Sequence, residues 1–169
     1  ANQNGKMCGT IADFTSFSFH AVKNLTTAEG GAICLNLPNP FDNAELYKEL
    51  RMMSLNCQTK DAFSKSKAGG WRYDIVGFGM KINMADVNAA IGLAQIREYS
   101  ELLKERKRVF DTYNNAFSAY DWAIVPPSVD GEKESSYHIY ALRVKGFTEE
   151  QRDRMIDEIA KSEVAVNVH

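Results

Sequence analysis

The chain has 169 residues, a length that suits one ordinary domain, or one domain with part of a second. Hydrophobic residues make up 44% of it and charged residues 25%, and the formal net charge is −2. This balance gives no global attraction to nucleic acid or to an anionic membrane surface, and no apolar run approaches the roughly 20 residues that span a bilayer.

The first predicted elements are two strands joined by a loop. Residues 11–19 end in an alternation of phenylalanine and serine, which is typical of a strand with two different faces. A second strand is expected over residues 32–37, where it ends at a Pro-Asn-Pro turn that cannot continue a ladder. The loop between the two strands contains Lys23 and ends in a Gly-Gly pair.

A helix is expected next, from Asp42 or Asn43, either of which suits its N-cap, to about residue 54. Residues 57–70 are polar and show no periodicity, so we expect an exposed loop there. Thr148 begins a capping box that predicts a helix to about residue 162. The remaining expected elements are helices over residues 84–96 and 100–120, a strand over 136–145 and a strand that begins at 164.

This order of strands and helices predicts an α/β protein with a boundary near residues 97–125. The part before the boundary has too few strands to form a covered sheet by itself, and the part after it ends on a predicted strand. We therefore expect the chain to be a piece of something longer. Its cysteines, Cys8, Cys34 and Cys57, form no metal-ligand pattern, so we expect no metal site and a reducing, cytoplasmic compartment.

Lys23 is the strongest candidate for chemistry, because it follows a strand flanked by phenylalanines and precedes a turn rich in threonine and glycine. Partial burial disfavours the charged form of an amine, and a neutral amine condenses with a carbonyl carbon. Ser18, Thr26 and Thr27 offer hydroxyl groups to a phosphate nearby. On the residues alone, a solvated lysine in a surface turn is the more common alternative.

Residues 18–31 read Ser-Phe-His-Ala-Val-Lys-Asn-Leu-Thr-Thr-Ala-Glu-Gly-Gly. This string closely resembles the lysine segment of the DegT/DnrJ/EryC1/StrS family of pyridoxal-phosphate (PLP) sugar aminotransferases. The resemblance implies that Lys23 binds the cofactor aldehyde covalently and carries protons, and that Ser18 contacts the PLP phosphate. Related sugar dehydratases have histidine at the lysine position, so Lys23 indicates amino transfer.

Residues 79–96 resemble the family stretch that reaches the PLP phosphate of the neighbouring subunit in a dimer. The resemblance implies that Lys81 or Asn83 makes this contact, and the two stay open; a plain helix cap is the alternative for Asn83. Residues 136–140 resemble a small-domain strand in which His138 is either a substrate-side group or a core histidine. The last four residues resemble an element that would place His169 near the substrate.

The resemblance covers nearly the whole chain but less than half of a family member. It implies fold type I of the PLP-dependent transferases, with residues 1–97 as the C-terminal part of the large domain, 98–125 as a linking helix and 126–169 as the start of the small domain. It also implies amino transfer, with glutamate as the usual donor, to a nucleotide-linked ketosugar for polysaccharide or secondary-metabolite synthesis, in a homodimer with shared active sites.

The family's Gly-Thr phosphate loop, stacking aromatic residue and pyridine-pairing Asp precede the lysine segment and are absent before residue 16. We therefore expect the 169-residue chain by itself to be inactive and to hold no cofactor. The alternative function is a catalytically inactive relative that serves as a dimerisation or binding module. Its contact surface would be the small-residue helix around Ala89 and the apolar stretch from Trp71 to Met80.

Overall fold

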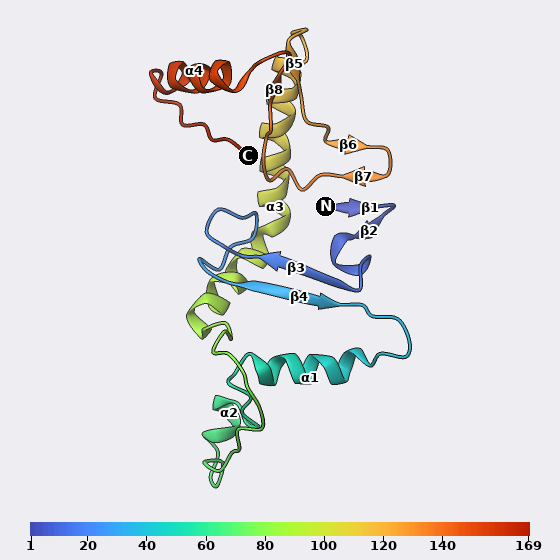
Figure 1. The fold of residues 1–169 in the computed structure, drawn as a ribbon, viewed down its shortest axis with the longest axis vertical. Coiled ribbons are helices and arrows are strands. Elements are labelled where there is room, and N and C mark those ends of the chain that lie inside the picture. Colours follow the sequence, from blue (N-terminus) through green and yellow to red (C-terminus); the bar gives the residue numbers. More distant parts are fainter. The chain divides into compact units, whose positions relative to one another are not determined.

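The computed structural model describes residues 1–169, apart from the side chain at position 62. The chain forms two compact units, Ala1–Ser100 and Glu101–His169 (Figure 1). One 32-residue helix, α3 (Asp86–Phe117), supplies residues to both units. Among the described residues, no helix combines the length and the apolar character that crossing a bilayer requires.

The continuity of α3 corrects the prediction of two helices over residues 84–96 and 100–120, which was wrong. The residues between the two predicted helices, 97–99, are Arg, Glu and Tyr, and neither Gly nor Pro interrupts the backbone there. Such side chains are tolerated in a helix interior, so nothing in this short stretch stops the hydrogen-bond ladder.

A hairpin forms the centre of the first unit. β3 (Phe14–Ser18) pairs antiparallel with β4 (Gly31–Leu35), in a register that runs from Phe14 opposite Leu35 to Ser18 opposite Gly31 (Figure 1). The short 3₁₀ helix η1 (Cys8–Thr10) packs against it, since a Cβ added at Gly9 would lie 3.2 Å from both the Cys34 sulfur and the Phe17 ring. β1 (Asn2–Gln3) and β2 (Lys6–Met7) form a smaller antiparallel hairpin.

The helix predicted after the second strand is present as α1 (Asn43–Met53). Asp42 is its N-cap, because its carboxylate accepts from the backbone N–H groups of Ala44 (2.8 Å) and Glu45 (3.2 Å). The side chain of Asn43 instead bonds both backbone polar groups of Leu37, at 3.0 Å each. Asn43 therefore ties the helix start to the end of the hairpin rather than capping the helix.

The segment 57–70, predicted as an exposed loop, contains a short helix, α2 (Ala62–Lys65). Asp61 precedes it and accepts from the backbone N–H of Ser64 at 2.8 Å. The backbone and side-chain hydrogen bonds from Ser64 hold the pKa of Asp61 below its ordinary value. A single helical turn with a good cap has no apolar periodicity, which explains why the pattern indicated a loop.

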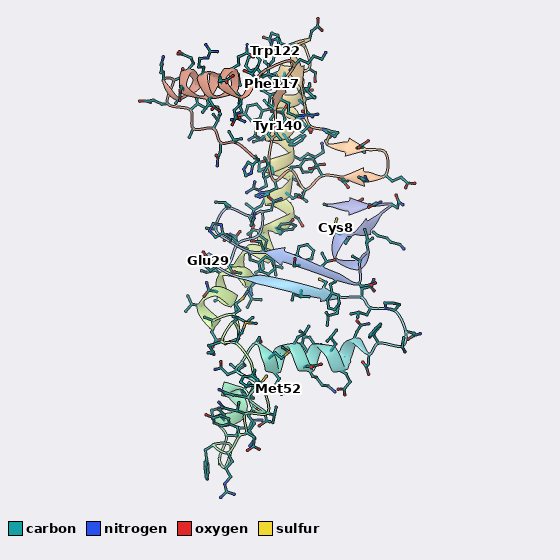
Figure 2. The ribbon with its side chains drawn as sticks, viewed as in Figure 1. Cys8, Glu29, Met52, Phe117, Trp122 and Tyr140 are labelled. Carbon is teal, nitrogen blue, oxygen red and sulfur yellow. The ribbon has the colours of Figure 1, made fainter. Side chains whose placement is uncertain are left out.

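Aromatic side chains form the core of the second unit. Phe110 is 3% exposed and makes edge-to-face contacts with Tyr137 and Tyr140, at centroid distances of 5.4 and 5.0 Å. Phe117 lies against both Tyr140 and Trp122, as Figure 2 shows at the C-terminal end of α3. Burial raises the pKa of Tyr140, and burial followed by the Glu134 carboxylate raises that of Tyr137.

Short strands complete the second unit: β5 (Ala123–Ile124) pairs antiparallel with β8 (Arg143–Val144), and β6 (Val129–Asp130) with β7 (Lys133–Glu134). The strand predicted over 136–145 is therefore confined to β8. Tyr137 has φ of +54°, which no extended strand allows. Residues 164–169, where a strand was predicted to begin, pair with none of the described residues.

The capping box predicted at Thr148 is confirmed at the start of α4 (Glu149–Ala160). The Thr148 hydroxyl accepts from the Gln151 N–H, and the Gln151 side chain accepts from the Thr148 N–H. We expect Thr148→Ala to lower the free energy of unfolding by about 1 kcal/mol, measured by urea denaturation. Thr148→Ser keeps the cap and should behave as the unmodified protein; equal stability of the alanine variant would contradict this role.

Candidate active site

The loop between β3 and β4, residues 19–30, holds Lys23 half-buried. The backbone N–H of Phe19 donates to the Gly30 carbonyl at 2.8 Å. This hydrogen bond joins the two ends of the loop and extends the hairpin ladder by one residue. The N–H of Lys23 donates to the His20 carbonyl at 2.9 Å, so Lys23 sits at the end of a tight turn. The loop therefore presents its lysine from a backbone that is fixed on both sides.

The two threonines of the loop do not offer their hydroxyls to a ligand, which corrects the prediction from the sequence. Thr26 donates its hydroxyl to the Phe19 carbonyl at 3.3 Å and accepts from the Ala28 N–H at 2.9 Å. Thr27, only 2% exposed, donates to the Glu29 carbonyl at 2.8 Å. Both side chains are structural parts of the loop, because its non-repetitive backbone needs these partners.

Ser18 lies at the end of β3 with an exposed side chain. Its oxygen accepts from the backbone N–H of His20 at 3.4 Å, a long bond that leaves the hydroxyl proton directed elsewhere. Since the His20 carbonyl in turn accepts from the Lys23 N–H, hydrogen bonds through His20 connect Ser18 with Lys23. The structure thus places Ser18 at the end of β3 and Lys23 at the end of the turn that follows it.

Lys81 and Asn83 lie at the end of a segment, residues 71–83, whose backbone bonds to the end of α1 through Met80. Lys81 donates to the Asn83 side-chain oxygen at 2.5 Å, and both side chains are exposed. Asn83 lies three residues before the first residue of α3, Asp86, so it is not the residue that caps this helix. The structure brings the two candidates together and does not choose between them.

The backbone of this segment is held closely by residues after α1. Met80 donates to the Met53 carbonyl at 2.8 Å, and its own carbonyl accepts from the Asn56 N–H at 3.0 Å. The buried thiol of Cys57 donates to the Phe78 carbonyl at 3.1 Å. A Cβ at Gly79 would lie 2.7 Å from the Met53 oxygen and closer still to the Cys57 nitrogen, so only glycine fits.

The two predicted histidines belong to the second unit and face different hollows. Half-buried His138 lines a groove of about 380 Å³ with aromatic and charged side chains that include Arg106, Tyr113 and Tyr140. His169 lines a hollow of about 500 Å³ beside α4. The structure therefore does not place the two histidines in one cavity of this unit.

Asn88 is a residue at this site that sequence reasoning missed. From the first turn of α3, its side-chain amide donates to the Thr27 carbonyl at 2.7 Å and to the Glu29 carbonyl at 3.3 Å. Glu29, labelled in Figure 2, marks the end of the lysine loop. The only signal in the sequence was the nearness of Asn88 to small residues, which indicated close packing but not its partner.

Known proteins resemble this chain along its whole length. The family profile described as "DegT/DnrJ/EryC1/StrS aminotransferase family" matches residues 1–169. The spore coat polysaccharide biosynthesis protein SpsC of Bacillus subtilis is 35% identical over 140 residues, which are 82% of this chain and 34% of SpsC. The UDP-4-amino-4,6-dideoxy-N-acetyl-beta-L-altrosamine transaminase of Campylobacter jejuni is 26% identical over 165 residues, which are 98% of this chain and 40% of that protein.

A solved structure, the putative sugar aminotransferase Spr1654 from Streptococcus pneumoniae in its PMP-form, superposes with a TM-score of 0.90 at 46% identity. The match covers 99% of this chain and 42% of that one. The chain thus spans less than half the length of the proteins that it resembles. Its architecture is part of fold type I of the PLP-dependent transferases, and the chain belongs to the DegT/DnrJ/EryC1/StrS aminotransferase family.

Proposed function

We propose that the protein containing this chain is a PLP-dependent aminotransferase that moves an amino group from glutamate to a ketosugar linked to a nucleotide. The observation that carries this proposal is the setting of Lys23, half-buried on a turn whose loop is closed by the β3–β4 ladder. A lysine held in this way can meet a carbonyl group without a large loss of conformational freedom.

The donor groups of Lys23, Ser18 and Lys81 fit PLP, which carries an aldehyde and a phosphate and, when bound, supplies an electron sink for amino transfer. The Lys23 amine would bind the aldehyde carbon covalently and act as the group that accepts and donates a proton during amino transfer. The Ser18 hydroxyl, whose oxygen already accepts from His20, has its proton to donate to a phosphate oxygen. Lys81, exposed and linked to Asn83, offers a positive charge to the same kind of group.

The proposed substrate follows from the chemistry named for the relatives. One relative is a transaminase for a UDP-linked amino sugar, and another acts in polysaccharide biosynthesis. We propose a nucleotide-sugar substrate of this general class, used for surface polysaccharide or secondary-metabolite sugars. His138 and His169, which line concave surfaces of the second unit, are proposed as substrate-side residues.

We also propose a homodimer in which Lys81 or Asn83 reaches the phosphate site of the other subunit. Support comes from the apolar side chains around them: Phe78 is 102% exposed and its neighbours Ile75, Val76 and Met80 are each more than half exposed. A surface of this kind is typical of a contact region. The three cysteines are unpaired, which suits the proposed cytoplasmic location.

The test is chemical mapping on the intact protein. PLP is added, the visible spectrum is recorded, borohydride reduces any bond between amine and aldehyde, and peptide mass spectrometry locates the pyridoxyl group. We expect the label on Lys23, with the other lysines unlabelled at equimolar PLP. A catalytically inactive dimerisation module, which the exposure of Phe78 also suits, would carry no specific label, and that result would exclude the proposed enzyme.

A further inference from the structure

The lysine loop is anchored at a point four residues after Lys23. Thr27 is the most deeply buried polar residue of the described chain, at 2% exposed. Its N–H donates to the Phe19 carbonyl at 2.9 Å, and its hydroxyl donates to Glu29. The carbonyl of Thr27 points the other way, toward α3, and needs a partner there because it is buried.

Asn88 supplies that partner from a distant part of the sequence. Its amide group donates to the Thr27 carbonyl at 2.7 Å, a short bond, and to the Glu29 carbonyl at 3.3 Å. One side chain thus bridges two carbonyls of the loop across a sequence separation of about 60 residues. Because an amide NH₂ carries two protons, a single asparagine satisfies both acceptors.

The shape of the contact shows that α3 and the loop fit closely here. Gly92, four residues after Asn88 and therefore on the same face of the helix, is buried, and a Cβ there would lie 2.8 Å from the Thr27 methyl group. A Cβ at Gly30 would collide with the Thr27 hydroxyl and lie 2.8 Å from the Met84 terminal methyl. Small residues let the helix approach closely enough for Asn88 to reach the loop backbone.

We propose that Asn88 is a positioning residue for Lys23: by holding the Thr27 and Glu29 carbonyls to α3, it fixes the loop that presents the amine. The inference rests on the proposed function, in which the Lys23 amine would condense with the PLP aldehyde with loss of one water. An amine that is held in place before this condensation loses less freedom on binding the cofactor than a mobile amine does. Asn88 thus acts through the loop backbone, to which its amide donates at Thr27 and Glu29.

The test compares Asn88 variants of the intact protein by two measurements. Asn88→Asp keeps the size of the side chain but replaces the amide donor with a carboxylate, which faces two carbonyl oxygens. Asn88→Ala removes the amide group and leaves a residue that favours the helix. For both variants we expect amide hydrogen exchange of Thr27 and Ala28 to become about tenfold faster, and the apparent Kd for PLP to rise about tenfold. Asn88→Gln, which retains the donor, should recover most of both.

Asn115→Ala is the matched control, an exposed asparagine of the same helix, and should change neither measurement. Unchanged exchange in the Asp and Ala variants would overturn the inference, as would faster exchange with unchanged PLP affinity, which would show a purely structural contact. Lys23→Ala separates the two proposals. If the Lys23→Ala protein still binds PLP and still gives the reduced adduct, the proposed function is wrong. If both are lost, the proposed function stands, and the Asn88 variants then test only the positioning role of Asn88.

Discussion

Replacing Lys23 with arginine is expected to lower the rate of the proposed amino transfer by about 10³-fold or more. Arginine keeps the positive charge and a similar length, so the loop and its hydrogen bonds should persist. Its guanidinium stays protonated at any ordinary pH and cannot condense with an aldehyde. The measurement is transfer from glutamate to a nucleotide-linked ketosugar by the intact protein, followed by mass spectrometry of the sugar product.

The matched control for this variant is Lys6→Arg, at an exposed position in the N-terminal hairpin. It should leave turnover unchanged, which shows that arginine is tolerated where no chemistry is proposed. The Lys23 variant should also lose the visible absorption band of lysine-bound PLP. Full turnover in the Lys23→Arg protein would remove the basis of the proposed function, whatever the sugar substrate.

The substitution Gly79→Ala is expected to lower the free energy of unfolding by about 2–3 kcal/mol. The added Cβ would meet backbone atoms of Met53, Asn56 and Cys57, and backbone atoms cannot rotate away as a flexible side chain can. The segment must move, and with it the hydrogen bonds of Met80 to the end of α1. Urea denaturation of the purified protein measures the loss.

Gly77→Ala is the internal control for that prediction. A Cβ at Gly77 would lie 3.6 Å from the Cys57 sulfur, which is an ordinary van der Waals contact. The two glycines are two residues apart in one segment, so composition and exposure are closely matched. We expect the Gly77 variant to lie within about 0.5 kcal/mol of the unmodified protein. Equal effects at both positions would show that close backbone approach is not the reason for Gly79.

The sequence predicted well those elements that are determined by local chemistry. The Asp42 cap, the Thr148 capping box and the phenylalanine–serine alternation of β3 each depend on residues within a few positions of one another. The lysine loop was recognised through residues 18–31, which in the structure form the loop between β3 and β4 and the ends of the two strands. These are features that a single stretch of sequence can encode.

Features that depend on distant partners were missed or wrong. Asn88 looks like any polar residue on a helix, and only the folded chain shows that it meets Thr27. The alternation over 136–145 resembles a strand, but Tyr137 turns into the left-handed region and its ring packs on Phe110. Tertiary packing decided the backbone there, against the local pattern.

Residues 75–82 form a surface whose exposed side chains are largely independent of the contacts that attach the segment to α1. Backbone hydrogen bonds and the Cys57 thiol hold the segment to the end of α1 and the residues after it, and Gly79 lets the two backbones approach closely. The outward side chains, such as Phe78, contribute little to that attachment. Substitutions at these outward positions are therefore expected to leave the fold of the segment unchanged. In the proposed homodimer, this region would be the place to change pairing preference, for instance to favour pairing between two different engineered variants over self-association.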